Sequence, residues 1–312
     1  MFPRGCDARL AVNRSALLTR LLCHVGEVKE MRLEPAKSYD RAWPHSRQGV
    51  HYDDTAPIHC SKERSMAPKN TYGQPIGDAV LDGAPRPLPH AQELPGRYCT
   101  LVRLDPHQHA EDLYAAYSAA SDDRDWTYLP EGPFSDLDSF RHWAQAAAES
   151  TDPRHYAVID NSSGRALGTL SLLRHDPVNG VIEVGFIVLS RALQRTPIST
   201  EAQFLLMRYV FEDLGYRRYE WKCDALNAPS RRAAERLGFT YEGTFRQAVI
   251  YKGRNRDTAW FSILDSEWTA VRAGFEAWLD PRNFDEDGMQ LNPLQAQQSL
   301  GQGFPHSSAP EG

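Results

Sequence analysis

The sequence predicts one α/β domain, over about residues 96–270, built on a mixed sheet that is flanked by helices. Three observations predict this class. Short segments alternate apolar and polar residues as strands do, longer segments carry apolar residues at helical spacing, and turn-forming residues separate the two kinds. The segments follow the order β-α-α-β-β-β-α-β-α-β-β without an internal repeat, which indicates a single sheet.

The chain before this domain is rich in proline, with ten of the 21 prolines in the first 96 of 312 residues. Because proline restricts φ and lacks an N–H donor, segment 84–89 favours an extended conformation. We expect residues 1–65 to be a disordered extension and residues 66–95 an irregular, proline-rich arm. Two further interpretations of residues 1–65 stay open: a transit peptide, and a translation start at Met66.

The domain opens with a strand and two helices. Residues 97–104 alternate like a strand. Asp105 then supplies an N-cap acid and Pro106 a first-turn proline, which predict a helix to about residue 120. A loop at 125–130 separates this helix from a second one, expected at 135–149.

Three strands are expected next, at 155–160, 166–173 and 181–189. Segments 161–164 and 176–180 separate them and are rich in Asn, Asp, Gly, Pro and Ser, which favour tight turns. Short turns join antiparallel neighbours, so these strands should form a meander.

A buried helix is expected at 200–214, where one face is apolar and Gly215 supplies a C-cap. The remaining elements are a strand at 217–224, a helix at 229–237, strands at 239–248 and 258–264, and a helix at 266–279. The last helix has aromatic residues at helical spacing and should dock on the domain. The domain boundary falls within this helix, at about residue 270. Residues 271–312 therefore comprise the rest of the helix and a loose C-terminal tail.

Composition narrows the class of partner. A formal charge of −6 argues against nucleic acid, and no apolar run approaches the roughly 18 residues that a membrane helix needs. The five cysteines are odd in number and form no C-x-x-C pair, which fits reduced thiols in an intracellular compartment. We therefore expect a cytoplasmic monomer or homodimer that binds no nucleic acid, no membrane and no metal.

One strand–loop–helix junction is suited to an anion. Strand 182–188 leads into loop 193–199, and a helix opens at Thr200. Free backbone N–H groups and the positive end of a helix dipole converge at such a junction and favour a pyrophosphate. Arg191 and Arg195 would add positive charge.

Motifs in a fixed order carry a resemblance to a known family. They are Glu-x-Gly at 183–185, Thr-Glu-Ala at 200–202, Tyr-Arg-Arg-Tyr-Glu-Trp-Lys-Cys at 216–223, Asn-Ala-Pro-Ser at 227–230, Ala-Glu-Arg-Leu-Gly-Phe at 234–239 and Tyr-Glu-Gly-Thr-Phe-Arg at 241–246. With them the chain resembles the GNAT superfamily of acetyl-CoA-dependent N-acetyltransferases, in its RimJ/RimL-like branch. The resemblance implies a mixed, mostly antiparallel sheet that is splayed between two parallel strands, here 181–189 and 217–224.

The resemblance also implies a site for acetyl-CoA in the gap between those strands. The pyrophosphate would lie on loop 194–200, Asn227 would hydrogen-bond the pantetheine arm, and Ser230 would lie near the thioester sulfur. The residues so implied are Phe186, Ile187, Val188, Gln194, Arg195, Thr196, Ile198, Ser199, Thr200, Asn227 and Ser230. The alternatives are that Asn227 only begins a helix and that Ser230 is a solvated first-turn residue. Pro197 departs from the family's glycine and removes one N–H.

Transfer to an amine needs a proton acceptor, a polarised thioester carbonyl and a proton donor for the thiolate. By resemblance Glu183 is the candidate base, directly or through water, and backbone N–H groups near Phe186 would polarise the carbonyl. Ser230 is the candidate acid and Tyr251 a reserve acid. A structural carboxylate is the alternative for Glu183. The second glutamate of RimL-like enzymes has no counterpart here, because its position falls close to Val249.

The acceptor pocket would be formed by the first two helices, their loop and the last strands. Its candidate residues are Trp126, Tyr128, Phe134 and Arg246, with Arg254 and Asp257 at the rim. Core packing is the alternative for the aromatic residues. Three functions stay open: acetylation of a small-molecule amine, acetylation of a peptide N-terminus, and CoA binding without catalysis.

Overall fold

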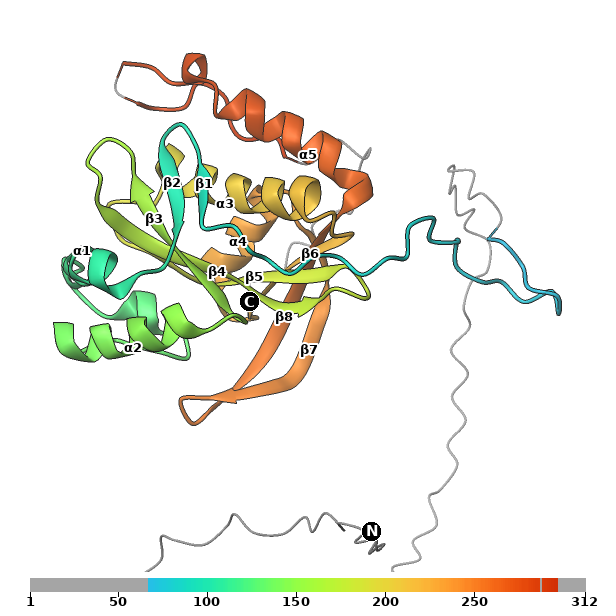
Figure 1. Cartoon of the computed structure of the whole chain (residues 1–312), viewed down its shortest axis with the longest axis horizontal. Coiled ribbons are helices and arrows are strands. Elements are labelled where there is room, and N and C mark those ends of the chain that lie inside the picture. The colour runs from blue at the N-terminus through green and yellow to red at the C-terminus, as the bar shows by residue number, and fades with distance from the viewer. Residues whose placement is uncertain (1–66, 287, 297–312) are drawn as a thin grey trace, which may run out of the picture. The chain divides into compact units, whose positions relative to one another are not determined.

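The computed structural model describes residues 67–286 and 288–296, which form one eight-stranded sheet and its helices (Figure 1). The expectations for residues 1–65 lie outside this range. The strands are β1 Glu93–Pro95, β2 Cys99–Arg103, β3 Arg154–Asp160, β4 Ala166–Asp176, β5 Val181–Leu189, β6 Arg218–Asp224, β7 Thr240–Tyr251 and β8 Arg254–Leu264. The helices are α1 Pro106–Ser118, α2 Leu137–Glu149, α3 Pro197–Arg208, α4 Ala228–Arg236 and α5 Asp265–Trp278.

The strand order is β1-β2-β3-β4-β5-β6-β8-β7, and β5 with β6 is the parallel pair. All other neighbours are antiparallel, including the predicted meander of β3, β4 and β5. The predicted fold class is therefore confirmed. Within the described residues, no helix is both long and apolar enough to cross a membrane.

The helices cover both faces of the sheet (Figure 1). α1 and α2 pack on one face around Leu113, Phe140 and Ala157. α3, α4 and α5 belong to a second core on the other face, where Phe204 of α3 stacks on Phe275 of α5 with ring centroids 5.3 Å apart. The apolar stripe of the last helix is thus buried, as its spacing predicts.

Strand β1 was not predicted, because residues 66–95 were expected to be irregular throughout. It pairs antiparallel with β2 and buries Leu94. Three residues are too few for an alternating pattern to stand out. Pro95 is tolerated because β1 is an edge strand.

The parallel pair separates along its length. The ladder between β5 and β6 runs from Val181 opposite Arg218 to Val184 opposite Trp221, and then stops. β5 continues to Leu189 and β6 to Asp224 without pairing to each other. The predicted splayed gap therefore begins after Val184.

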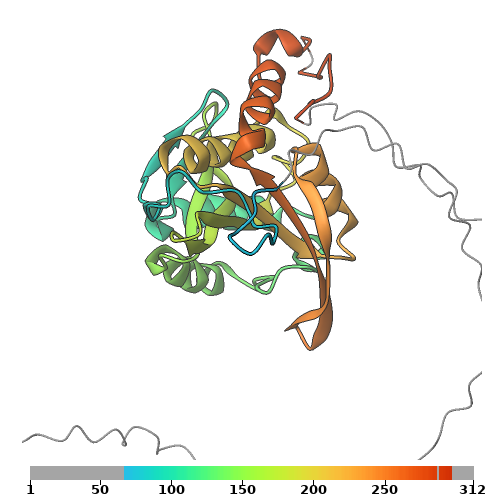
Figure 2. The same ribbon diagram turned by 90° about the vertical axis from the view of Figure 1, so that its right-hand side faces the viewer.

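Several element ends differ from the prediction, most notably at α3 and at the β7–β8 hairpin. α3 begins at Pro197 rather than at residue 200, because proline at the first helical position gives up only an N–H that has no partner within the helix. The β7–β8 hairpin is longer than predicted and projects beyond the sheet (Figure 2). Its turn is formed by Lys252 and Gly253, both at positive φ, and its exposed residues gave no core-facing alternation from which to predict it.

Candidate active site

A buried cluster of charges lies at the start of the gap. Glu183 on β5 stands opposite Glu220 on β6, and Lys222 lies two residues further along β6 on the same face. Nζ of Lys222 lies 2.8 Å from Oε2 of Glu183 and 2.8 Å from Oε2 of Glu220. It also lies 3.8 Å from the ring centroid of Trp260. A buried ammonium is satisfied here by two carboxylates and an aromatic face.

Glu183 uses only one of its oxygens in these contacts. Its side chain is 6% exposed, and Oε2 also accepts a 2.8 Å hydrogen bond from Nη1 of Arg174. Oε1 has no partner among the described residues, and the role of Glu183 as a base stays a prediction. This geometry combines the two interpretations of Glu183: one oxygen is structural and the other is available.

The cluster extends away from the gap through Glu220. Arg218 donates a 2.6 Å hydrogen bond to Oε1 of Glu220 and is also paired with Glu242. Burial alone would raise the pKa of Glu220, but hydrogen bonds from Lys222 and Arg218 outweigh it and hold that pKa below its usual range. Glu220 is therefore ionised and fully committed to its neighbours.

β5 is irregular beside the gap. Phe186 has a φ of 48°, and the register between β4 and β5 shifts between Thr169 and Ser171. Such a bulge turns backbone groups out of the regular ladder and is frequent beside active sites. Its position agrees with the prediction that N–H groups near Phe186 polarise the thioester carbonyl, which stays a prediction. The Phe186 ring lies 5.5 Å from the ring of His155.

His155 is a buried, uncharged neighbour of this bulge that sequence analysis missed. It is 3% exposed, and its Nδ1 has no hydrogen-bond partner. Burial, and secondly the positive charge of Arg103, lower the pKa of His155 to about 4. His155 is therefore neutral near pH 7.

We expect His155 to make the fold less stable in weak acid. The folded-state pKa lies below the unfolded value of about 6.5, so the unfolded chain binds the proton more strongly between those values. This contribution is complete above pH 6.5 and is lost as the pH falls toward 4. Between pH 7 and pH 5 wild type should lose about 2 kcal/mol more of its unfolding free energy than His155→Leu, measured by urea denaturation. Equal losses in both proteins would contradict this.

The start of α3 is open. Its N-cap, Thr196, makes no side-chain cap hydrogen bond; its hydroxyl instead donates to the carbonyl of Leu193 at 2.7 Å. Ser199 likewise donates to the carbonyl of Thr196 at 2.8 Å. The first N–H groups of the helix are therefore left for another acceptor. Pro197 has no N–H at the first helical position, but the backbone N–H groups of Ile198 and Ser199 come next in the helix.

The loop before α3 has a strained backbone conformation. Arg195 has a φ of 64°, a conformation that favours glycine, and Gln194 donates to the carbonyl of Leu189 at 3.1 Å. A cavity of about 410 Å³ adjoins the first turn of the helix. It is lined by Arg97, Tyr98, Asp160, Asn161, Ser162, Thr196, Pro197 and Ile198.

A second cation, which sequence analysis did not assign, reaches the same helix end. Arg236, at the end of α4, donates a 3.1 Å hydrogen bond from Nη1 to the hydroxyl of Thr200. Burial lowers the pKa of Arg236 from its usual value, which still leaves it charged. With Arg195 it makes this junction positive, as an anion site requires.

Glu201, the second residue of the Thr-Glu-Ala motif, is structural. Its carboxylate accepts hydrogen bonds from three successive backbone N–H groups, those of Arg97 at 2.8 Å, Tyr98 at 2.6 Å and Cys99 at 2.8 Å. Gly96 leaves the room for it, because a Cβ there would lie 2.8 Å from Oε2 of Glu201. Glu201 therefore ties the β1–β2 turn to the first turns of α3.

Asn227 and Ser230 stand together where α4 begins. Oδ1 of Asn227 accepts from the N–H of Ser230 at 3.1 Å, so Asn227 is the N-cap of the helix. Oγ of Ser230 accepts a 3.0 Å hydrogen bond from Nε1 of Trp221. Helix capping uses Oδ1 of Asn227 and leaves its amide group free of protein partners within the described chain. The predicted contacts of both residues with a ligand stay predictions.

Tyr251, the reserve acid, holds its proton against Asp224. Its hydroxyl donates a 2.8 Å hydrogen bond to Oδ2 of Asp224 at the end of β6. Burial and the Asp224 carboxylate raise the pKa of Tyr251. The proton is therefore not free for a leaving thiolate in this arrangement.

The hairpin tip is attached to the loop between α1 and α2. Nζ of Lys252 donates to the carbonyls of Trp126 and Gly132, at 2.9 Å and 2.8 Å, and Arg254 donates to the carbonyl of Thr127 at 3.1 Å. Tyr128, a predicted acceptor residue, donates to the carbonyl of Leu226 at 3.2 Å. These contacts bridge the loop to the sheet edge. Arg246 is exposed where the β7 register shifts.

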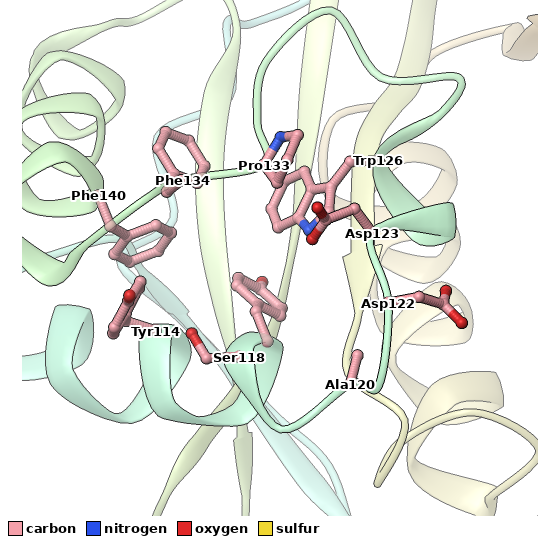
Figure 3. A pocket seen from close by; sticks show the side chains of 10 residues that line it. Tyr114, Ser118, Ala120, Asp122, Asp123, Trp126, Pro133, Phe134 and Phe140 are labelled. Carbon is pink, nitrogen blue, oxygen red and sulfur yellow. The ribbon is translucent and has the colours of Figure 1, made fainter.

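Trp126 and Phe134 lie in an aromatic cluster, with ring centroids 5.4 Å apart (Figure 3). They line a cavity of about 210 Å³. Its other lining residues are Tyr114, Tyr117, Ser118, Ala120, Asp122, Asp123, Pro133 and Phe140. The rings also contact each other edge-on, so the cluster serves packing as well as lining the cavity.

The structure thus brings most of the predicted site residues into four groups. Glu183 and the bulge at Phe186 border the gap, residues 194–200 form the open helix end, Asn227 and Ser230 stand at the start of α4, and the aromatic residues belong to the α1–α2 loop. Arg246 and Tyr251 lie on β7. Sequence analysis missed Lys222, Glu220 and Arg174 around Glu183. The charges at alternate positions 218, 220, 222 and 224 of β6 were the available signal, because they mark one polar strand face.

Comparison with known proteins agrees with this geometry. Residues 100–240 match the family described as "Acetyltransferase (GNAT) domain". "Putative ribosomal N-acetyltransferase YdaF" of Bacillus subtilis is 29% identical over 148 residues, which cover 46% of this chain and 78% of that protein. This relative is consistent with the RimJ/RimL-like resemblance.

Two solved structures are similar over almost their whole length. A GCN5-related N-acetyltransferase from Brucella melitensis is 50% identical, with 69% of this chain and 97% of that chain covered and a TM-score of 0.67. A probable GNAT-family acetyltransferase from Chromobacterium violaceum is 40% identical, with 63% and 98% covered and a TM-score of 0.59. The chain therefore belongs to the GNAT family of N-acetyltransferases and is an acyltransferase.

Proposed function

We propose that this protein transfers the acetyl group of acetyl-CoA to a primary amine of a small molecule, by direct attack in a ternary complex. The observation that carries the proposal is the gap between β5 and β6 after Val184 and Trp221. Glu183, which has one carboxylate oxygen without a partner in the described chain, lies at one end of the gap, and the uncapped N-terminus of α3 lies at the other. A thioester held in that gap would have its carbonyl beside the β5 bulge.

The described residues fit acetyl-CoA as the acetyl donor. The pyrophosphate is an anion, and the uncapped start of α3 with Arg195 and Arg236 offers N–H groups and positive charge. The pantetheine amides need partners along the strands, and β5 and β6 are unpaired with each other past Val184. The free amide group of Asn227 supports the predicted contact there. Bound in this way, acetyl-CoA supplies an activated acyl group.

The chain's own residues would manage the protons. The amine must be neutral to attack, and in this proposal Oε1 of Glu183 takes its proton, directly or through water. The C–N bond forms as the C–S bond breaks, and the thiolate receives a proton. Ser230 stays the candidate donor: its oxygen accepts from Trp221, and its own hydrogen, which faces the Cys223 thiol in the free protein, would turn to the sulfur of the bound thioester.

The contacts between the hairpin tip and the α1–α2 loop favour a small acceptor. The three hydrogen bonds from Lys252 and Arg254 join the hairpin tip to the α1–α2 loop and limit one side of the acceptor space. A peptide needs an open groove, whereas a small amine does not. The alternative, acetylation of a peptide N-terminus, is supported by the name of the YdaF relative.

A thiol-release assay tests the proposal and its alternative together. Purified full-length protein is given acetyl-CoA with a panel of small primary amines and of peptides with free N-termini. We expect amine-dependent release of CoA with a higher kcat/KM for small amines than for peptides. Higher values for peptides would establish the alternative, and no release with any acceptor would overturn both.

A further inference from the structure

Two polar side chains on β8 point to a function that the acetyl transfer itself does not explain. Thr258, Trp260 and Ser262 stand opposite Asp224, Lys222 and Glu220 of β6 in the ladder. They therefore share the sheet face that carries Glu183, since Lys222 contacts both Glu183 and Trp260. Arg256 precedes Thr258 by two residues and belongs to the same face.

Both side chains lack a partner. The hydroxyl of Thr258 is buried without a hydrogen bond, and the residue is 4% exposed. Nε of Arg256 is buried without a hydrogen bond, and the structure gives its guanidinium no ion pair within the described residues. Three other cations near Glu183, namely Arg174, Arg218 and Lys222, each form an ion pair. Arg256 and Thr258 differ from these residues because their buried polar atoms have no partner in the described chain.

An unpaired guanidinium nitrogen and an unpaired hydroxyl are unfavourable in a buried place. Nε of Arg256 and the hydroxyl of Thr258 lose hydrogen bonds to water on folding, and nothing in the described chain replaces them. Nearby acidic oxygens are already engaged: Oδ2 of Asp224 accepts from Tyr251, and Oδ1 accepts from the N–H of Leu226. A bound anion would satisfy both orphan groups.

The pair lies close to the open part of the gap. Thr258 is opposite Asp224, the last residue of β6. Burial raises the pKa of the Cys223 thiol, while the Ser230 hydrogen bond and then the charge of Arg256 lower it, so Arg256 acts at the end of β6. The start of α3, by contrast, has its own cations. The orphan pair is therefore available to the acceptor rather than to the pyrophosphate.

We propose that Arg256 and Thr258 bind a carboxylate of the acceptor, so that the substrate is an extended amine with a carboxylate at its far end, such as an amino acid whose amine is on the end of its side chain. This inference rests on the proposed acetylation of a small amine. A guanidinium offers two parallel donors to a carboxylate, and one hydroxyl adds a third. Ser262 is level with Glu183 across the sheet, and Thr258 lies four residues from Ser262, roughly 13 Å along β8. The acceptor would therefore lie extended, with its carboxylate on β8 and its amine toward Glu183.

The test compares acceptors that differ only in the carboxylate: an amino acid, its amide, and the amine left after decarboxylation. Wild type should favour the amino acid. Arg256→Gln should raise its KM about 10- to 100-fold and leave the amide and the amine within about twofold. Thr258→Val should raise the same KM by a few-fold. Arg282→Gln, at a side chain that is 90% exposed, makes the same charge change and should alter none of the three.

The free protein gives a second readout. Because Arg256 has no partner in the described chain, Arg256→Gln should leave the melting temperature unchanged or raise it. A lower melting temperature with unchanged acceptor preference would show a structural role and overturn the inference. Acetylation of all three acceptors with equal kcat/KM would overturn it too, while the proposed function would stand. No acetylation of any amine would instead overturn the proposed function.

Discussion

Glu183→Gln is expected to lower kcat by about 100- to 1,000-fold, because the amide cannot take the proton of the attacking amine. Oε1 of Glu183 is the only carboxylate oxygen of the Glu183, Glu220 and Lys222 cluster that borders the gap without a protein partner in the described chain. The substitution preserves the shape of the side chain. Steady-state kinetics with the preferred amine, at saturating acetyl-CoA, measures the effect.

The matched control is Glu242→Gln. Glu242 ends the same series of ion pairs at Arg218, and its side chain is 39% exposed. Surface pairs contribute little, so this variant should keep kcat within about threefold of wild type. Unchanged turnover in a folded Glu183→Gln protein would leave Glu183 as a structural carboxylate only. A large loss in both variants would assign the effect to the ion pairs rather than to a base.

The free energy of unfolding is expected to fall by about 3–5 kcal/mol in Glu201→Ala, because three backbone N–H groups lose their shared acceptor. Cys99 lies in the buried core, so its N–H cannot turn to water without local opening. The KM for acetyl-CoA should rise as well, because Glu201 helps to hold the start of α3. Urea denaturation and steady-state kinetics measure the two effects.

A conservative variant and a surface control test this prediction further. Glu201→Gln keeps one acceptor oxygen and should lose about half as much stability. Glu235→Ala removes an exposed glutamate from α4 and should change the free energy of unfolding by less than about 0.5 kcal/mol. If Glu201→Ala were as stable as Glu235→Ala, Glu201 would not anchor the β1–β2 turn.

Local sequence signals, such as helix caps and turn glycines, correctly predicted the elements that begin or end at such residues. Asp105 caps α1 by accepting from the N–H of His107, and Asn227 caps α4. Gly180 and Gly215 adopt positive φ at turns where glycine was expected. The signals failed where the partner is distant. β1 exists because β2 pairs with it, and the long hairpin is held by the α1–α2 loop rather than by an apolar stripe.

Some features of the candidate site could also be predicted from the sequence, and others could not. Motif order along the chain was enough to identify the family and to place Glu183 beside a gap and residues 194–200 at a helix start. It could not reveal that Lys222 and Arg174 meet one oxygen of Glu183, or that Arg236 reaches Thr200. Those contacts join residues from separate elements, and only the packed sheet brings them within hydrogen-bond distance.

The chain's order of strands, helices, turns and caps therefore follows from sequence alone, because such signals act between residues a few positions apart. The tertiary structure decided which charges are satisfied and which are left without a partner. Burial removes water from Glu183, His155, Thr258 and Nε of Arg256, and the surrounding elements then determine whether each group finds a partner. The acetyltransferase family was readable in the linear motifs, whereas the orphan groups that indicate its acceptor exist only in the folded sheet.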